Sequence, residues 1–438
     1  MTNLPKGSKK LLNAWAFYDW ANSVYTLTIA SAVFPIFYEA LFSDRGHYIE
    51  VFGLELKNSA LISFITALAF LFVAFFSPLL SGIADYVGNK KSFMKFFCYV
   101  GALSCTGLYW FELENIYVGL LFYFLGLIGY WGSLVFYNSY LPDIAFPEQQ
   151  DKISAKGYSL GYIGSVILLI INLGMIMKPE IFGITGKTSG EAAMKAMRYS
   201  FVMVGVWWIL FSQYTYYYLP KGNKETNRKL SGQFVFNGFK ELKKVWAILK
   251  DNIPLKRYLG GFFVSSMAVQ TVMLVATYFG AQEIQWASKE ESTTGLIICI
   301  LLIQLVAVLG AVLTSIASDK FGNIPTLIAI NVVWVGFCVF AYFITLPVHF
   351  YVMATMVGFV MGGIQSLSRS TYSKLLPETE DTASFFSFYD VAEKIGIVIG
   401  MALYGIIDQI TGSPRLAIVF LGIFFVIAVF LLRRVHKK

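Results

Sequence analysis

Five ionisable side chains interrupt long apolar stretches of the sequence: Asp19, Arg369, Asp390, Glu393 and Lys394. An unpaired ionised side chain at the depth of a lipid bilayer costs at least about 2.5–3.5 kcal/mol. If the apolar stretches lie in a membrane, each of these groups must therefore face an opposite charge or water. Groups of this kind mark the paths of ions and solutes through membrane proteins.

Three of the five are expected to lie at similar depth. Asp19 lies about six residues into the first apolar stretch, Arg369 about one turn from the end of the tenth, and Asp390 about one and a half turns into the eleventh. At about 1.5 Å per helical residue, they share a layer roughly 6–10 Å below one membrane surface. Either carboxylate could pair with Arg369. The pair would be a gate across a pathway or a permanent contact between helices, and both interpretations stay open.

Asp390 and Lys394 are four residues apart, which places them on one face of a helix where they can neutralise each other. Glu393 is then left without a dedicated partner near the middle of its apolar stretch. A lone carboxylate in such surroundings could take up and release a proton, which makes Glu393 a candidate for proton coupling. The alternative is that Glu393 shares Lys394 or meets water.

The elements that position these groups follow from the composition. The 438 residues are 57% hydrophobic and only 14% charged, whereas soluble domains contain about 25% charged residues. Stretches of about 20 apolar residues can span a bilayer as helices. The sequence therefore predicts an all-α membrane protein with twelve transmembrane helices, at residues 13–42, 58–82, 92–112, 116–140, 157–177, 199–219, 257–283, 295–318, 325–346, 350–373, 385–409 and 415–433.

A polar, basic segment divides this pattern into two sets of six. Residues 221–257 contain ten Lys and Arg residues against three acidic residues. Asp-Tyr-Val-Gly-Asn at 85–89 recurs as Asp-Lys-Phe-Gly-Asn at 319–323, and Leu-Pro-Asp at 141–143 recurs as Leu-Pro-Glu at 376–378. The offsets, 319 − 85 = 234 and 377 − 142 = 235, nearly agree, which indicates duplication. We expect six-helix bundles at 1–220 and 257–438, joined by a linker at 221–256.

The linker itself contains apolar residues at helical spacing beside four lysines. A basic amphipathic helix on the cytoplasmic membrane surface explains the pattern; a partner-binding helix or a solvated linker would also fit. Segments expected in the cytoplasm hold 25 Lys and Arg residues and those on the other side hold 8. This bias predicts a multi-pass protein of the cytoplasmic membrane with both termini inside. The apolar residues of the linker helix are Val235, Phe239, Leu242, Val245, Trp246 and Leu249.

Other chemistry is not indicated. The four cysteines lie in apolar stretches, as small buried hydrophobes do, and the three histidines lack metal-ligand spacing. The sequence contains no Gly-x-x-x-x-Gly-Lys-Ser/Thr motif, which a nucleotide-driven pump would need. The net charge of +8 suits anionic lipid headgroups better than nucleic acid. We therefore expect no metal, no cofactor, no nucleic-acid partner and no enzymatic activity.

Residues 81–91, Ser-Gly-Ile-Ala-Asp-Tyr-Val-Gly-Asn-Lys-Lys, resemble the signature loop of the major facilitator superfamily, Gly-x-x-x-Asp-x-x-Gly-x-Arg/Lys-Arg/Lys. Asp85 is expected to accept hydrogen bonds from a helix N-terminus, Gly88 to permit a tight turn, and Lys90 and Lys91 to reach the headgroups. Ser81 replaces the family's first glycine. The second copy, with Asp319 and Gly322, has Ser315 there and no paired basic residues, so its half is expected to be held less tightly.

Residues 15–25 (Trp-Ala-Phe-Tyr-Asp-Trp-Ala-Asn-Ser-Val-Tyr), 362–370 (Gly-Gly-Ile-Gln-Ser-Leu-Ser-Arg-Ser) and 385–390 (Phe-Phe-Ser-Phe-Tyr-Asp) resemble the branch that includes fungal vacuolar amino-acid effluxers linked to autophagy and their bacterial relatives. The resemblance implies two bundles in pseudo-twofold symmetry and secondary transport of a small polar organic solute, amino acids first. Sugars, peptides or nucleosides are alternatives, and a receptor or membrane enzyme is a more distant one. We expect a monomer, with protons as the candidate coupling ion.

Such transporters bind solutes near the membrane midplane, at the interface between their repeats. This favours polar side chains on the first, fourth, seventh and tenth stretches. Each one could instead make a hydrogen bond between helices. The predicted solute contacts are Asn22, Tyr25, Asn138, Gln270 and Gln365.

Overall fold

A computed structural model describes residues 4–42, 48–51, 53–221 and 234–435. The first half of the chain is a bundle of long helices with short helical turns between them. A small antiparallel hairpin, β1 (Tyr48–Val51) and β2 (Leu54–Lys57), precedes α3. The helices are α1 (Lys9–Val24), its π-helical continuation η1 (Tyr25–Ala32), α2 (Val33–Ala40), α3 (Asn58–Val87), α4 (Lys90–Gly107), η2 (Leu108–Trp110), η3 (Leu113–Asn115), α5 (Ile116–Ser139), α6 (Leu141–Ile144), α7 (Pro147–Met177), η4 (Pro179–Phe182) and α8 (Ser189–Tyr218).

The second half is a bundle of the same kind, preceded by a helix that lies across one end. Several of its helices begin where the sequence places a capping side chain: Asn252, Ser288 and Ser413 each accept a hydrogen bond from a backbone N–H of the first turn. The helices are α9 (Phe234–Asp251), α10 (Ile253–Glu283), α11 (Lys289–Phe321), α12 (Asn323–Phe343), α13 (Pro347–Leu375), α14 (Thr382–Thr411) and α15 (Pro414–Leu432).

Nine helical segments within the described ranges are long and apolar enough to cross a membrane. Their outward faces expose large apolar side chains such as Phe64, Leu309 and Phe430, as lipid contact requires. Three further helices of the bundle, α4, α8 and α14, coincide with predicted spans but carry three or more charged residues each. The nine spanning segments are 9–40, 58–87, 113–144, 147–177, 253–283, 291–321, 323–343, 347–375 and 414–432.

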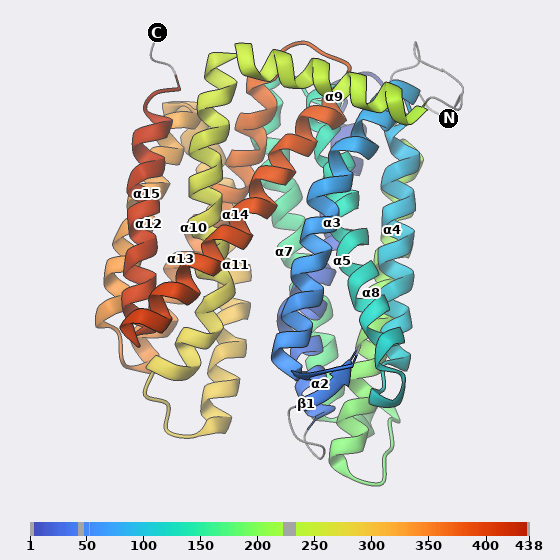
Figure 1. The fold of residues 1–438 in the computed structure, drawn as a ribbon, viewed down its shortest axis with the longest axis vertical. Coiled ribbons are helices and arrows are strands. Elements are labelled where there is room, and N and C mark those ends of the chain that lie inside the picture. Colours follow the sequence, from blue (N-terminus) through green and yellow to red (C-terminus); the bar gives the residue numbers. More distant parts are fainter. Residues whose placement is uncertain (1–3, 43–47, 52, 222–233, 436–438) are drawn as a thin grey trace.

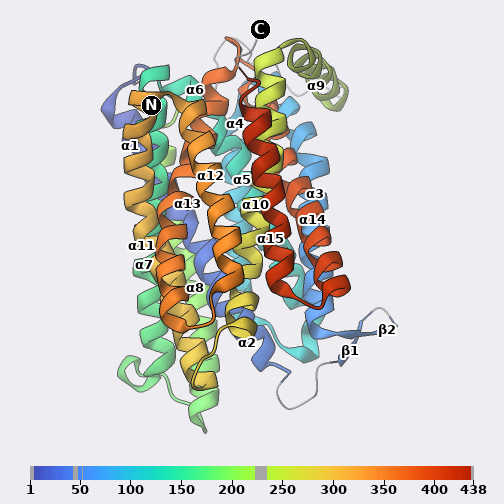
Figure 2. The same cartoon turned by 90° about the vertical axis from the view of Figure 1, so that its left-hand side faces the viewer.

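The two halves lie side by side, blue to green and yellow to red in Figure 1. Each half has its own buried apolar cluster, one drawn almost entirely from residues before 220 and the other from residues after 244. Between the halves, α3 packs against α14, and α7 packs against α11 and α13. The start of α1 and the end of α15 lie at one end of the bundle (Figure 1), whereas β1 and β2 lie at the other (Figure 2).

The predicted linker helix is present as α9, which crosses the end where α1 starts (Figure 1). Val245 and Leu249 are buried in the second apolar cluster, and the Trp246 ring contacts Phe388 of α14. The basic face stays exposed. Phe239 lies outside the residues whose side chains are described, and contact of α9 with a membrane surface remains a prediction.

Glycines let α11 and α13 approach at backbone distance. A Cβ at Gly358 would lie 2.6 Å from the carbonyl oxygen of Ile303, and a Cβ at Gly362 would overlap the carbonyl oxygen of Ala307. No side chain other than hydrogen fits at Gly362 without separating the two helices.

We therefore expect Gly362→Ala to lower the melting temperature of the purified protein by several degrees, because overpacking a tight contact costs about 1–3 kcal/mol. Gly336→Ala on α12 is the matched control, since nothing lies within 4 Å of a Cβ there. That control should be neutral or slightly stabilising because alanine favours helix by about 1 kcal/mol. Equal melting temperatures for the two variants would show that the helices separate without cost.

Candidate functional site

Arg369 of α13 joins the two halves. Its guanidinium makes an ion pair with Asp19 of α1, with 3.2 Å between Nη2 and Oδ2, and the side chains of Arg369 and Asp19 are only 2% and 6% exposed. Nη1 donates to Asp19 Oδ2 (3.3 Å) and Asn138 Oδ1 (3.2 Å), Nη2 also to the Ser154 carbonyl (3.0 Å), and Nε to Ser154 Oγ (3.0 Å). Five hydrogen bonds therefore match the five N–H groups of a guanidinium.

Aromatic rings surround this guanidinium. Its carbon lies 4.2 Å from the ring centre of Tyr158, 4.8 Å from Trp15 and 5.4 Å from Tyr137, distances at which a cation is attracted to the ring. The Tyr137 hydroxyl donates to Asp19 Oδ2 at 2.8 Å. Trp15 stacks on Tyr137 and donates to its carbonyl oxygen. The rings exclude water and hold the ion pair in one geometry.

Gly157 of α7 supplies the space for this cluster. A Cβ there would overlap Asp19 Oδ2 and would lie 3.0 Å from Arg369 Nη2. Ser154, one turn earlier on α7, also donates to the carbonyl of Ser366 in the other half. The sequence singled out neither residue because their role appears only when α1, α7 and α13 are brought together.

A second charged cluster lies deeper in the bundle, on α14. Lys394 Nζ lies 2.9 Å from Asp390 Oδ1 and 2.8 Å from Glu393 Oε2. The predicted pairing of Asp390 with Lys394 is therefore correct, and Asp19 rather than Asp390 is the partner of Arg369. Of the two interpretations of Glu393, the one without a partner is wrong and the one in which it shares Lys394 is correct, because one ammonium reaches both carboxylates. Gln270 Nε2 also donates to Glu393 Oε1 at 2.9 Å.

The remaining predicted solute contacts have different surroundings. Gln365 accepts a hydrogen bond from the Tyr162 hydroxyl of the other half at 2.7 Å. Tyr25 stacks on Tyr130 inside the first bundle and is fully buried. Asn22 is also fully buried. Asn138 and Gln365 are therefore brought to the interface between the halves, whereas Gln270 contacts Glu393 of its own half and Tyr25 lies inside the first bundle.

The first signature loop fastens the two halves at the end where α1 starts. Gly88 ends α3 with a φ of 68°, the left-handed conformation expected there. Asp85 accepts hydrogen bonds from the backbone N–H groups of Ala383 (3.3 Å) and Ser384 (2.7 Å) in the first turn of α14. The predicted interaction with a helix N-terminus is confirmed, and it crosses between the halves.

Lys90 does not reach the headgroups, and neither does Lys91; both are 5% exposed, which corrects that expectation. Lys90 Nζ forms an ion pair with Asp143 and donates to the Thr382 hydroxyl at the start of α14. Lys91 donates to the Leu219 carbonyl at the end of α8. The chain turns these lysines inward because buried acceptors are available at helix ends.

At the second loop, the carboxylate that accepts the hydrogen bonds is not the loop's own Asp319. Asp319 is exposed, and Gly322 has a φ of 86° between α11 and α12. Asp151 of α7 instead accepts hydrogen bonds from Ser318, Asn323 and Lys374, the last at 2.6 Å. The second fastening therefore also crosses the halves but takes its carboxylate from the opposite bundle.

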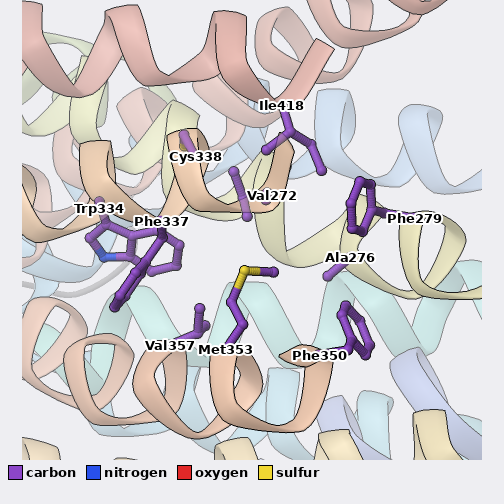
Figure 3. A pocket seen from close by; sticks show the side chains of 11 residues that line it. Val272, Ala276, Phe279, Trp334, Phe337, Cys338, Phe350, Met353, Val357 and Ile418 are labelled. Carbon is purple, nitrogen blue, oxygen red and sulfur yellow. The ribbon is translucent and has the colours of Figure 1, made fainter. Parts of the chain in front are cut away.

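A small cavity lies inside the second bundle, between α10, α12, α13 and α15 (Figure 3). Its volume is about 30 Å³, and its lining includes Val272, Trp334, Met353 and Ile418. Solute sites usually measure about 300–1,000 Å³ and contain a few converging polar groups. The cavity is a packing space and not a binding site.

Two bundles of membrane helices with buried charges between them have the fold of major facilitator transporters. The FucP transporter in its outward conformation superimposes with a TM-score of 0.72 at 14% identity, covering 98% of this chain and 99% of its own. The human organic anion transporter MFSD10 does so with a TM-score of 0.70 at 10% identity, covering 97% and 99%.

Sequence comparison identifies the family within the major facilitator transporters. The family described as vacuole effluxer Atg22 like matches residues 7–438. The uncharacterized MFS-type transporter YxiO of Bacillus subtilis is 30% identical over 97% of this chain and 95% of its own length. Autophagy-related protein 22 of Eremothecium gossypii is 23% identical, covering 95% and 88%. The chain belongs to the Atg22-like family of membrane transporters and is not an enzyme.

Arg369→Ala should lower the free energy of unfolding by about 3–5 kcal/mol, because it leaves Asp19 buried without its countercharge. Arg433→Ala, on the exposed end of α15, should change it by less than about 0.5 kcal/mol. Thermal unfolding in detergent measures both.

The same variant should loosen the fastened end. A cysteine placed at buried Ser373 of α13, in a background without Cys98, Cys105, Cys299 and Cys338, should react faster with a maleimide when Arg369 is alanine. Lower stability with an unchanged reaction rate would assign the pair to helix packing alone.

Proposed function

We propose that the protein is a secondary active transporter that moves a small polar organic solute, amino acids first, by alternating access. The observation that carries the proposal is the Arg369–Asp19 pair, which ties the two halves together at one end through buried hydrogen bonds. Such a contact can break only if the halves move apart. Alternating access requires this kind of reversible closure around a central site.

The proposed architecture is twelve transmembrane helices in two six-helix bundles related by a pseudo-twofold axis, at 1–220 and 257–438 with the linker at 221–256. The charged helices α4, α8 and α14 would complete the nine apolar spans. The repeated loop sequences and the matching contacts of α3 with α14 and of α7 with α11 support this symmetry.

Within this architecture the Arg369 cluster acts as a gate. Asp85, Lys90 and Asp151 fasten the same end of the bundle through helix termini. The fastened state would open to the opposite side, and the similar FucP structure is in an outward conformation. The Ser373→Cys reaction rate distinguishes this gate from a fixed packing contact.

The resemblance to amino-acid effluxers and the charged side chains of the site both favour amino acids as the solute. A zwitterion needs one cationic and one anionic surface. Arg369 pairs with Asp19 across the halves, and Glu393 shares Lys394, which contacts Trp131 of the other half. Other solutes remain alternatives, since structures of this fold include a fucose:proton symporter and a proton:xylose symporter. Among these classes, a thermal-shift screen against amino acids, sugars, peptides and nucleosides would identify the ligand.

We place the protein in the cytoplasmic membrane as a monomer, with both termini and α9 in the cytoplasm. The bias of Lys and Arg supports this orientation. Lys240 of α9 and Lys187, between η4 and α8, are both exposed, and these segments lie at opposite ends of the bundle (Figure 1).

Cysteines introduced singly at Lys187 and Lys240 should therefore react differently with an impermeant thiol reagent added to intact cells. Lys187→Cys should be labelled within minutes, and Lys240→Cys should be labelled only after the membrane is made permeable. The opposite pattern would invert the orientation.

Proton coupling is assigned to Glu393 and Asp390, because two carboxylates share the single ammonium of Lys394. A proton on this pair would complete its charge balance. Glu393→Gln should reduce amino-acid accumulation driven by a pH gradient in liposomes to background, whereas counterflow exchange should persist at saturating amino acid, with a higher half-saturating concentration because the negative charge is lost. Glu180→Gln, an exposed carboxylate of η4, should retain both activities.

Accumulation that persists in Glu393→Gln would remove Glu393 from the coupling step, and Asp19 would be tested next. Wild-type protein that neither accumulates nor exchanges amino acids would exclude this solute class.

A further inference from the structure

Lys394 is held in a cage that recognises an ammonium group. Its Nζ lies 3.5 Å from the ring centre of Trp131, a residue of α5 in the opposite half, and 2.8 Å from Glu393 Oε2. An aromatic face combined with a carboxylate is the combination by which proteins bind ammonium ligands. The Lys394 side chain is 1% exposed, whereas that of Glu393 is 18% exposed. The carboxylate side of the cage is therefore the less enclosed side.

The cage has more acceptors than its occupant uses. Asp390 Oδ1 lies 2.9 Å from Lys394 Nζ, but Asp390 Oδ2 is buried and makes no hydrogen bond within the described chain. Gln270 of α10 holds Glu393 by donating to Oε1, which leaves Oε2 directed at the ammonium. Two carboxylates, one of which has an unpaired buried oxygen, serve a single cation. Buried acceptors of this kind are normally paired.

We propose that Trp131 and Glu393 form the subsite for a primary ammonium group of the transported solute, and that Lys394 occupies it when the solute is absent. This inference rests on the proposed function and adds where one end of the solute binds. Lysine's long flexible side chain allows the exchange. When a solute arrives, Lys394 withdraws to Asp390 and takes Oδ2 as well as Oδ1. Two ammonium groups then face two carboxylates.

In this arrangement the bound solute would also contact both halves. Trp131 belongs to α5, whereas Glu393, Asp390 and Lys394 belong to α14. In the structure described, Lys394 makes the contact between the halves at this depth, about 18 Å along α14 from its start. The solute's ammonium would replace that contact when it binds. Trp131 is thereby a specificity-determining residue that the sequence did not indicate.

The experiment removes the tethered ammonium and returns it as a free molecule. Lys394→Ala deletes the atoms of n-propylammonium, so this cation is the matched probe. We expect Lys394→Ala to melt at a lower temperature than wild type and to regain several degrees in millimolar n-propylammonium chloride, because a ligand that binds only the folded state stabilises it. Wild type, with its cage filled, should gain less than one degree.

The controls separate the cage from general effects of the probe. Exposed Lys156→Ala should show no gain, and 1-propanol should not replace n-propylammonium. Adding Trp131→Leu to Lys394→Ala should abolish the gain. An equal gain in melting temperature in wild type and Lys394→Ala, or an equal effect of 1-propanol, would contradict the proposed ammonium site.

A second variant keeps the test decisive if Lys394→Ala fails to fold. Trp131→Leu, in a chain that retains Lys394, should reduce the preference for an amino acid over its N-acetyl derivative by about fivefold, the value of a cation–π contact of roughly 1 kcal/mol. Trp110→Leu, at an exposed tryptophan, should leave that preference unchanged. An unchanged preference in Trp131→Leu would overturn the subsite.

The two hypotheses fail separately. Rescue of Lys394→Ala by n-propylammonium without amino-acid transport by the wild type would retain the ammonium subsite and exclude amino acids as the solute. Amino-acid transport by the wild type, without rescue and with an unchanged preference in Trp131→Leu, would retain the function and exclude the subsite.

Discussion

Burial of the Arg369 guanidinium between the halves is the constraint on which the rest of the site depends. A guanidinium cannot lose its proton in a protein, so every N–H that leaves water needs an acceptor. Asp19, Asn138 and Ser154 supply those acceptors from three helices of the first half. The glycine at 157 follows from the same requirement, because α7 must approach closely enough for Ser154 to reach Nε.

The end that holds the Arg369–Asp19 pair is also fastened by contacts at the ends of helices, ion pairs among them. Asp85 binds the N-terminus of α14, and Asp381, which precedes that helix, pairs with Lys244 of α9 at 2.7 Å. The hydrogen bond to Asp381 raises the pKa of Lys244, as expected for an ammonium group beside a carboxylate. Since α9 packs on both α3 and α14, it bridges the two helices that would separate in the proposed opening of this end.

The sequence predicts best what is local. Asp390 and Lys394 pair because four residues separate them on one helix, and α9 forms because its apolar residues recur at helical spacing. It predicts less where packing decides. Lys90 turns inward because Asp143 and Thr382 meet there, and Trp131 faces Lys394 only once α5 and α14 are adjacent. Glu393 gains Lys394 although an adjacent residue is a poor partner by spacing, because one ammonium can reach both carboxylates.

A buried ion pair suits a gate because its net contribution to stability is small. The desolvation of two charges offsets most of their attraction in the closed state, and both charges regain water when the halves separate. Breaking the Arg369–Asp19 contact therefore costs far less than removing either partner. An apolar contact of equal area would lose its burial on opening with no such compensation. In the proposed gate, the charged cluster would hold the closed end in one geometry and would still release it within the small free-energy difference that a bound solute or proton can supply.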